Sequence, residues 1–109
     1  MFSVGTLPTH EVWPGFVARM AHTGHMSFVW WTVTAGATVP AHSHPHEQVV
    51  HMLEGDFELT VDGTTHRMTP GTVVVIPGGI THSARAVSAS KLLDVFQPVR
   101  EDYQARFGA

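Results

Sequence analysis

The stretch PAHSHPHEQVVHMLEG, residues 40–55, holds four of the nine histidines of this 109-residue chain. It raises the question of which imidazoles can share one metal ion, for which histidine is a common ligand. Side chains two residues apart on a strand point to the same face, which brings His42 and His44 together. Pro45 interrupts strand pairing directly afterwards, so we do not expect His46 to continue on that face. For His46 two roles stay open, lining the pocket or supporting a ligand from behind.

A second strand begins near Glu47, and its side chains alternate between two faces. If the apolar Val50 and Met52 pack inward, Gln48 also points inward, toward the histidine pair. His51 then points away from the pair, so it is not expected to be a ligand.

The stretch PGTVVVIPGGITHS, residues 70–83, contributes one more histidine. A strand ends at Pro77, a Gly-Gly turn follows, and His82 begins the next strand. Three imidazoles and one amide oxygen suit one divalent first-row transition metal, with Ni, Zn, Mn and Fe all open. The chain has no cysteine, so thiolate ligands are excluded. The predicted ligands are His42, His44, Gln48 and His82.

The apolar runs of the chain are short, rich in valine, threonine and aromatic residues, and separated by glycine and proline, a pattern typical of strands. Asp62-Gly63 predicts a tight hairpin between residues 57–61 and 65–68. Residues 101–109 could form one short turn of helix. Many short strands predict an all-β sandwich or barrel, and jelly rolls, barrels and immunoglobulin-like sandwiches all fit. The expected strands cover residues 28–34, 48–53, 56–61, 72–77 and 91–97.

Length and composition indicate one folded domain over residues 1–109. The hydrophobic share is 43% and the charged share 14%, which is typical of globular chains. The net charge of −3 and the lack of a basic run argue against nucleic acid as a partner. No stretch approaches the roughly 20 apolar residues of a membrane-spanning helix, and no basic residue precedes Arg19 in the manner of a signal peptide. We therefore expect a cytoplasmic protein with no membrane partner.

Both histidine-bearing stretches resemble the sequence motifs of the cupin family. Residues 36–55 match the first motif and residues 71–82 the second, with Gln48 where the family usually has glutamate and Ala86 where it often has asparagine. The matching anchors are Gly36, His42, His44, Gly55, Gly71, Pro77, Gly79 and His82. The resemblance implies a double-stranded β-helix, or jelly roll, of two antiparallel sheets with the metal inside its mouth.

Glutamine in place of glutamate removes one negative charge from the predicted ligand set. Neutral protein ligands leave the full charge of the ion uncompensated, so the centre should attract anionic oxygen ligands and lower the pKa of bound water. Four protein ligands also leave two positions open on an octahedral ion. Two adjacent open positions suit a bidentate oxygen ligand, such as a carboxylate with a neighbouring hydroxyl.

A second informative stretch is LLDVFQPVRED, residues 92–102. Asp94 lies in a strand whose two faces are otherwise largely apolar, and a buried carboxylate is costly unless it is paired or used. One hypothesis is a structural ion pair of Asp94 with Arg100 or Arg85. The other gives Asp94 a proton-transfer role, Arg100 a carboxylate-binding role and Phe96 the role of a wall.

Residues 13–103 as a whole resemble the KdgF-type pectin-degradation cupins. That family acts on 4,5-unsaturated uronates released by pectate and alginate lyases and promotes their conversion to linear keto forms. The resemblance implies a metal held by three histidines and one glutamine, matching His42, His44, His82 and Gln48. It also implies active-site roles for Asp94, Phe96 and Arg100.

Three functional hypotheses follow. The first is an isomerase-like, metal-assisted ketonisation of an unsaturated uronate, an anionic sugar acid. The second is a cupin dioxygenase of a small organic substrate, which would require a redox-active metal. The third is a non-catalytic cupin that binds a sugar acid or a metal. Asp94 and Arg100 favour the first, because they supply a proton carrier and an anion clamp.

The apolar strand surface exceeds what one small barrel interior needs. We therefore expect a homodimer that buries the outer face of one sheet, because large exposed apolar patches mark interfaces. The residues behind this expectation are Trp30, Trp31, Val49, His51 and Leu53.

Overall fold

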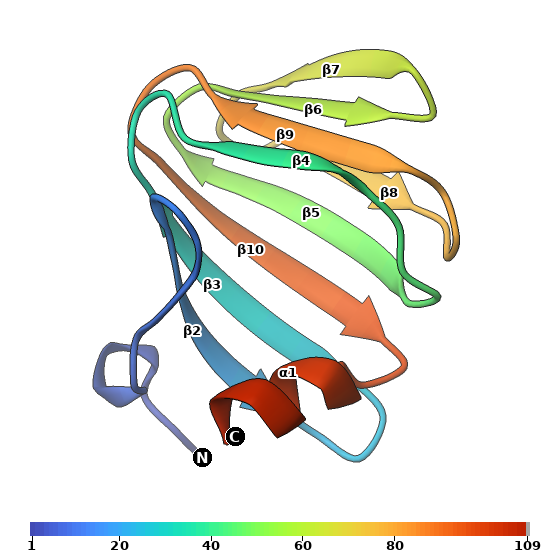
Figure 1. The fold of residues 1–109 in the computed structure, drawn as a ribbon. Helices are drawn as coiled ribbons and strands as arrows, with labels where there is room; N and C mark the ends of the chain where they lie inside the picture. Colours follow the sequence, from blue (N-terminus) through green and yellow to red (C-terminus); the bar gives the residue numbers. More distant parts are fainter. Residues whose placement is uncertain (109) are drawn as a thin grey trace.

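The computed structural model describes residues 1–108 and folds this part of the chain into ten strands, one 3₁₀ helix and one α-helix (Figure 1). The strands are β1 (His10–Trp13), β2 (Phe16–His22), β3 (Ser27–Val33), β4 (Thr38–His42), β5 (Glu47–Glu54), β6 (Phe57–Val61), β7 (Thr64–Met68), β8 (Val73–Ile76), β9 (His82–Ala86) and β10 (Ser90–Gln97). The helices are η1 (Val4–Thr6) and α1 (Glu101–Phe107).

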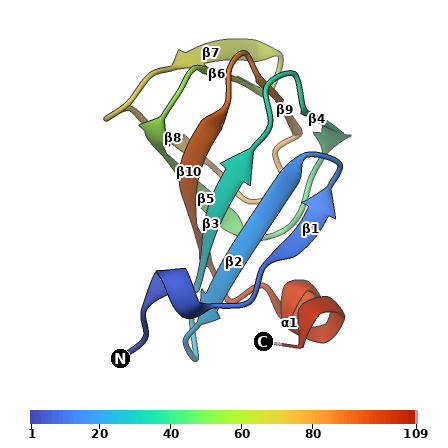
Figure 2. The same ribbon diagram turned by 90° about the vertical axis from the view of Figure 1, so that its left-hand side faces the viewer.

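The strands form two antiparallel sheets that lie one over the other (Figure 1). The larger sheet has six strands in the order β1-β2-β3-β10-β5-β8, and the smaller has four in the order β4-β9-β6-β7. Strand β10 therefore lies between two strands from the first half of the chain. Figure 2 shows β1 and β2 at one edge of the larger sheet, with α1 near the ends of these strands. The expected jelly roll of two antiparallel sheets is confirmed.

Alternating burial along β5 and β10 decides which side chains enter the space between the sheets. The buried residues are Gln48, Val50 and Met52 on β5, and Ser90, Leu92, Asp94 and Phe96 on β10. Four of these seven are apolar and supply the hydrophobic driving force for packing. The inward face expected for Gln48, Val50 and Met52 is thus confirmed, and Gln48 and Asp94 enter the core beside each other.

The Asp-Gly hairpin also forms as expected. Asp62 and Gly63 have φ angles of 49° and 81°, and Val61 pairs with Thr64 across the turn. Two consecutive positive φ angles favour a type I′ turn, whose twist matches that of the strands. Within residues 1–108, the helices are too short and too polar to span a membrane.

Three parts of the chain differ from the sequence-based expectations. Strands β1 and β2 were not predicted, although the burial pattern of β2 alternates. We expected His42 and His44 on one strand. Strand β4 ends at His42, however, and His44 lies on the following loop. Helix α1 covers more than one turn and is capped by Gly108, which has a φ of 69°; of the expected 101–109 turn, Ala109 lies outside the described residues.

Candidate metal centre

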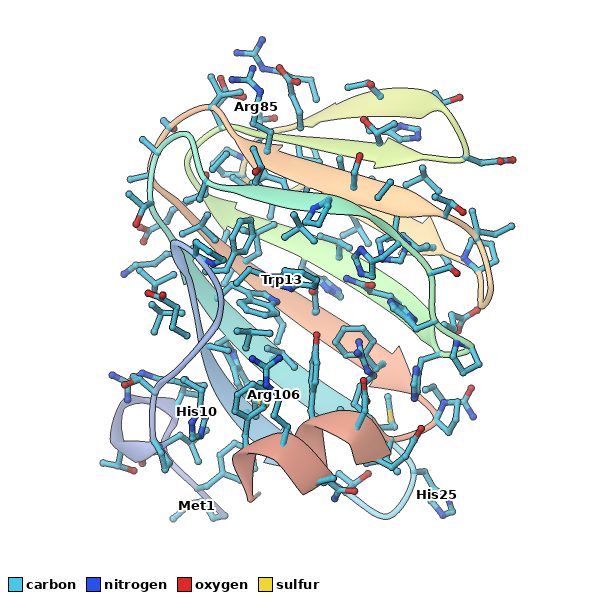
Figure 3. All side chains as sticks on the ribbon, viewed as in Figure 1. Met1, His10, Trp13, His25, Arg85 and Arg106 are labelled. Atoms are coloured by element: carbon cyan, nitrogen blue, oxygen red, sulfur yellow. The ribbon has the colours of Figure 1, made fainter. Side chains whose placement is uncertain are left out.

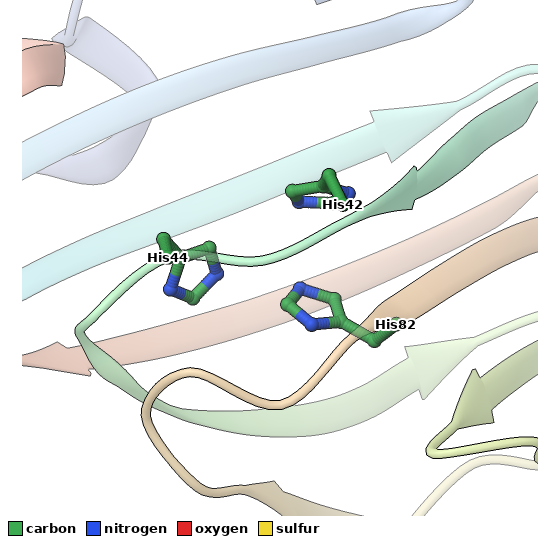
Figure 4. Close-up of side chains that lie close together, drawn as sticks. All are labelled: His42, His44 and His82. Carbon is green, nitrogen blue, oxygen red and sulfur yellow. The ribbon is translucent and has the colours of Figure 1, made fainter.

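Three of the predicted ligands meet at one end of the space between the sheets (Figure 4). His42 at the end of β4 pairs in register with His82 at the start of β9, and their ring centroids are 4.4 Å apart. The ring of His44 lies 4.9 Å from that of His82 and 5.8 Å from that of His42. One nitrogen from each ring lies within 4.8 Å of the others, a cluster that could hold one metal ion.

Close contact between two loops places His44 in this cluster. The backbone N–H of Gly79 donates to the carbonyl of His44 at 2.8 Å. A Cβ atom on Gly78 would lie 2.2 Å from the carbonyl oxygen of Pro45, so only glycine allows this approach. The Gly-Gly turn therefore lets the β8–β9 connection pack directly against the β4–β5 loop.

Backbone carbonyls fix the tautomer of each ring. The Nδ1 atoms of His42, His82 and His44 lie 2.9, 2.9 and 3.1 Å from the carbonyl oxygens of Pro40, Ile80 and His46. A carbonyl oxygen only accepts, so each Nδ1 carries the hydrogen and each neutral ring keeps a lone pair on Nε2. Burial, helped by the Arg100 charge, lowers the pKa of His44 to about 4, so this ring is neutral near pH 7.

Gln48 supplies the fourth polar group of the cluster. Its Nε2 donates to Oδ2 of Asp94 at 2.8 Å, which fixes the orientation of the amide. Its Oε1 then faces Nε2 of His44 at 3.1 Å. In the neutral tautomer both of these atoms are electron-pair donors, and a cation beside them would satisfy both. The donor set therefore fits a divalent first-row metal ion.

Asp94 is only 6% exposed, and its two carboxyl oxygens differ in their hydrogen-bond partners. Oδ2 accepts from the indole N–H of Trp31 at 2.9 Å and from Gln48, whereas Oδ1 has no hydrogen-bond partner within residues 1–108. Burial raises the pKa of this carboxyl to about 7, against the opposing effect of the two hydrogen bonds. Both protonation states are therefore accessible near neutral pH.

The hypothesis of a structural ion pair for Asp94 is wrong. Arg85 projects outward from β9 and pairs with Glu58 at 3.0 Å (Figure 3). Arg100 pairs with Asp102 instead, because the carboxylate two residues along reaches the guanidinium edge directly.

Arg100 lines the same cavity as the histidines and Asp94, although it is only 6% exposed. Its Nε and Nη2 donate to Asp102 at 2.9 and 2.7 Å, so this carboxylate does not take Nη1. The guanidinium carbon lies 3.8 Å from the ring centroid of Tyr103 and 4.7 Å from that of Phe96. Cation–π contact with both rings holds the charge at the cavity wall.

The cavity beside these groups measures about 60 Å³. Sequence reasoning missed several of the lining residues, Trp13 and Tyr103 among them. Trp13 lies between the sheets, 5.6 Å from the His42 ring (Figure 3), and β1 was not predicted. Tyr103 follows Arg100 by three residues, a spacing that places both on one side of a helical turn.

His46 is buried but stays outside the triad. Its Nε2 lies 3.2 Å from a Glu101 carboxylate oxygen, and its carbonyl accepts from the ring of His44. The structure therefore gives His46 a supporting position behind one predicted ligand. His51 points away from the triad, as expected, and its Nδ1 lies 3.2 Å from the Leu93 carbonyl.

Comparison with known proteins gives matches of several kinds. The family described as Cupin domain matches residues 29–96. The structure of KdgF from Halomonas sp. superimposes with a TM-score of 0.88 at 30% identity, covering 94% of this chain and 97% of that one. An RmlC-like cupin from Shewanella frigidimarina gives 0.89 at 27% identity, covering 94% of both chains. L-ectoine synthase from Hahella chejuensis is 34% identical over 69 residues, which is 62% of this chain and 52% of that protein. The chain spans about half the length of the ectoine synthases that it matches.

Proposed function

The chain belongs to the cupin family, and we propose that it is a metal-dependent enzyme that promotes the ketonisation of 4,5-unsaturated uronates. The observation that carries this proposal is the meeting of three groups at one cavity: a histidine cluster, a buried carboxyl with an unpaired oxygen, and a guanidinium. The substrate class comes from the resemblance of residues 13–103 to the KdgF-type cupins. The similarity to KdgF over 94% of the chain supports it.

The proposed metal ligands are His42, His44, Gln48 and His82. When bound, a divalent first-row ion supplies Lewis-acid polarisation of the substrate oxygens. The carbonyl bonds to Nδ1 hold the three rings in one orientation, and the Gln48 amide is held by Asp94. The protein thus presents a preformed, uncharged donor set that favours anionic oxygen ligands.

Arg100 is the proposed contact for the substrate carboxylate. Its Nη1 is the part of the guanidinium that Asp102 does not occupy, and charge-assisted hydrogen bonds to carboxylates are among the stronger ones. Phe96 and Tyr103 flank the guanidinium and exclude water from one side. This geometry would bind an anionic sugar acid with its carboxylate beside Arg100.

Asp94 is the proposed proton carrier. Ring opening of the unsaturated uronate breaks the bond between the anomeric carbon and the ring oxygen. The anomeric hydroxyl becomes the aldehyde, and its proton passes to the ring oxygen, which leaves an enol. Ketonisation then moves the enol proton to the neighbouring carbon, C4, so that no atom is gained or lost and no oxidant is needed. A carboxyl with a pKa of about 7 can both accept and return a proton at neutral pH.

We also propose that a second copy of the chain covers the outer face of the larger sheet. Two cross-strand rows of side chains lie on this face, and together we call them the outer-face patch: Phe28, Val95, Val49 and Val75 in one row, Trp30, Leu93, His51 and Val73 in the other. An isologous dimer needs only one such surface. Trp31, which we expected here, points inward instead.

The test of the enzymatic proposal is an assay of the purified chain, stripped of metal and then reloaded separately with Ni, Zn, Mn or Fe. Unsaturated galacturonate is the substrate, and NMR follows the appearance of the keto product. We expect turnover that depends on metal but not on oxygen. Oxygen-dependent consumption would favour a dioxygenase, and saturable binding without turnover would favour a binding protein.

A further inference from the structure

Asp94 receives hydrogen bonds from both neighbouring strands, and both reach the same oxygen. Trp31 on β3 donates its indole N–H to Oδ2 at 2.9 Å, and Gln48 on β5 donates its amide N–H to Oδ2 at 2.8 Å. Both donors lie diagonally across from Asp94, whose direct partners are Val29 and Val50. Diagonal positions on a sheet are within reach of long side chains. The carboxyl is therefore held from two sides, with Oδ1 left over.

We propose that Trp31 is a positioning residue, whose indole N–H holds Oδ2 so that Oδ1 is the oxygen that exchanges a proton with the substrate. The inference rests on the proposed function of Asp94. A carboxyl group rotates readily about its terminal torsion, which is broad and two-fold. With two donors on Oδ2, rotation away from this orientation would break both hydrogen bonds, so one oxygen stays held while the other stays free of these donors.

Trp31 also acts on Gln48 through the shared oxygen. The Gln48 amide presents Oε1 to His44 only while its N–H group has Oδ2 as an acceptor. If Oδ2 moved away, the Gln48 amide would lose the acceptor that fixes its orientation. Trp31 is thus placed to hold the proton carrier and one predicted ligand in register through the hydrogen bonds that they share at Oδ2.

The competing explanation is that Trp31 only fills space. The side chain is 7% exposed and packs edge-on against Phe16, with ring centroids 5.8 Å apart. Trp31→Phe keeps an aromatic ring but removes the N–H group. Trp30→Phe is the matched control, because it removes the same group from the adjacent residue, whose side chain lies on the opposite face of the strand.

Steady-state kinetics of wild type, Trp31→Phe and Trp30→Phe, all metal-loaded, form the first arm of the test. Misplaced catalytic groups cost up to about a hundred-fold in rate, so we expect kcat of Trp31→Phe to fall about ten- to a hundred-fold with little change in KM. Trp30→Phe should match wild type in both. A wild-type kcat in folded Trp31→Phe, or a change confined to KM, would overturn the inference.

The second arm reads the hydrogen bond without turnover and works even if Trp31→Phe fails to fold. The chain has three tryptophans, so the ¹⁵N–¹H spectrum contains three indole N–H signals. In Asp94→Ala one signal, that of Trp31, should move upfield and exchange faster with solvent, while the other two stay. If none of the three indole signals moves, the inference is overturned. If wild type is inactive with every metal, the proposed function fails, and this signal still decides whether Trp31 holds Oδ2.

Discussion

Gln48 donates its amide N–H to Asp94 at 2.8 Å, while the other end of the same amide faces the ring of His44. One side chain therefore connects the proposed metal ligands to the proposed proton carrier. This connection gives a reason for glutamine where glutamate is usual. A glutamate here would place a second carboxylate against a buried one, and two close carboxylates resist ionising together.

Gln48→Glu should therefore bind metal at least as well as wild type but turn over more slowly. The added carboxylate offsets the charge of the ion, yet the pair then shares one proton and titrates as a unit. We expect kcat to fall about ten-fold or more, measured alongside metal content by elemental analysis. Full activity in the metal-loaded variant would show that an uncharged amide is not needed between the metal ligands and the proton carrier.

Asp94→Asn tests the proton carrier itself. The asparagine oxygen can accept from Trp31 and Gln48 in the place of Oδ2, so packing and metal content should be kept. Asparagine cannot accept the proton, and we expect kcat to fall about a hundred-fold or more. A folded, metal-loaded and fully active variant would leave the uronate proposal resting on family resemblance alone.

Arg100→Ala should weaken recognition of the substrate carboxylate. Loss of one charge-assisted hydrogen bond predicts a higher KM and a kcat/KM lower by about ten- to a thousand-fold. Arg85→Ala is the control, because Arg85 pairs with Glu58 on the smaller sheet and does not line the cavity. Equal effects of the two substitutions would contradict a specific anion contact.

Much of the site could be predicted because strand alternation is a local property. The period of two, together with the apolar Val50 and Met52, placed Gln48 in the interior, and its burial confirms this. On the Asp94 strand both faces are largely apolar, so the period could not decide which face is buried. The end of β4 could not be predicted in this way, and His44 reaches the triad through a loop contact with Gly79 that depends on tertiary structure.

The partners of the charged groups were harder to predict. Trp31 and Asp94 are 63 residues apart in the sequence, and only the pairing of β3 with β10 brings them together. The pairing of Arg100 with Asp102 is local, but the sequence offers several carboxylates at similar distance. Alternation would have separated Trp30 from Trp31, since adjacent residues on a strand face opposite ways.

The ion pair of Arg100 and Asp102 predicts a pH dependence of stability. Hydrogen bonds from Arg100 lower the pKa of Asp102 to about 2, from 3.8 for the free side chain. Because this pKa is depressed in the folded state, the pair stabilises the fold above about pH 4, and the stabilisation is lost as the pH falls toward 2. The Asp102 side chain is 52% exposed, so we expect about 0.2–1 kcal/mol.

Asp102→Asn in metal-free protein should therefore be less stable than wild type at pH 6 and equally stable near pH 2. Denaturant unfolding at several pH values measures the difference. Glu11→Gln, an exposed residue of β1 without an ion pair in the described part of the chain, is the control. A difference that does not depend on pH would mean that Asp102 acts through packing or helix capping alone.

The outer-face patch predicts a homodimer in solution. Val73 and Val75 are 52% and 55% exposed, and both lie on β8 at the edge of the larger sheet. Val75→Glu introduces a charge into a row that is otherwise apolar, and burying an unpaired charge is costly. We expect wild type to be a dimer by light scattering at micromolar concentration and Val75→Glu to be a monomer. Thr64→Glu, on the smaller sheet, should remain a dimer. A monomeric wild type would contradict the prediction, whereas a dimer unaffected by Val75→Glu would place the interface on another surface.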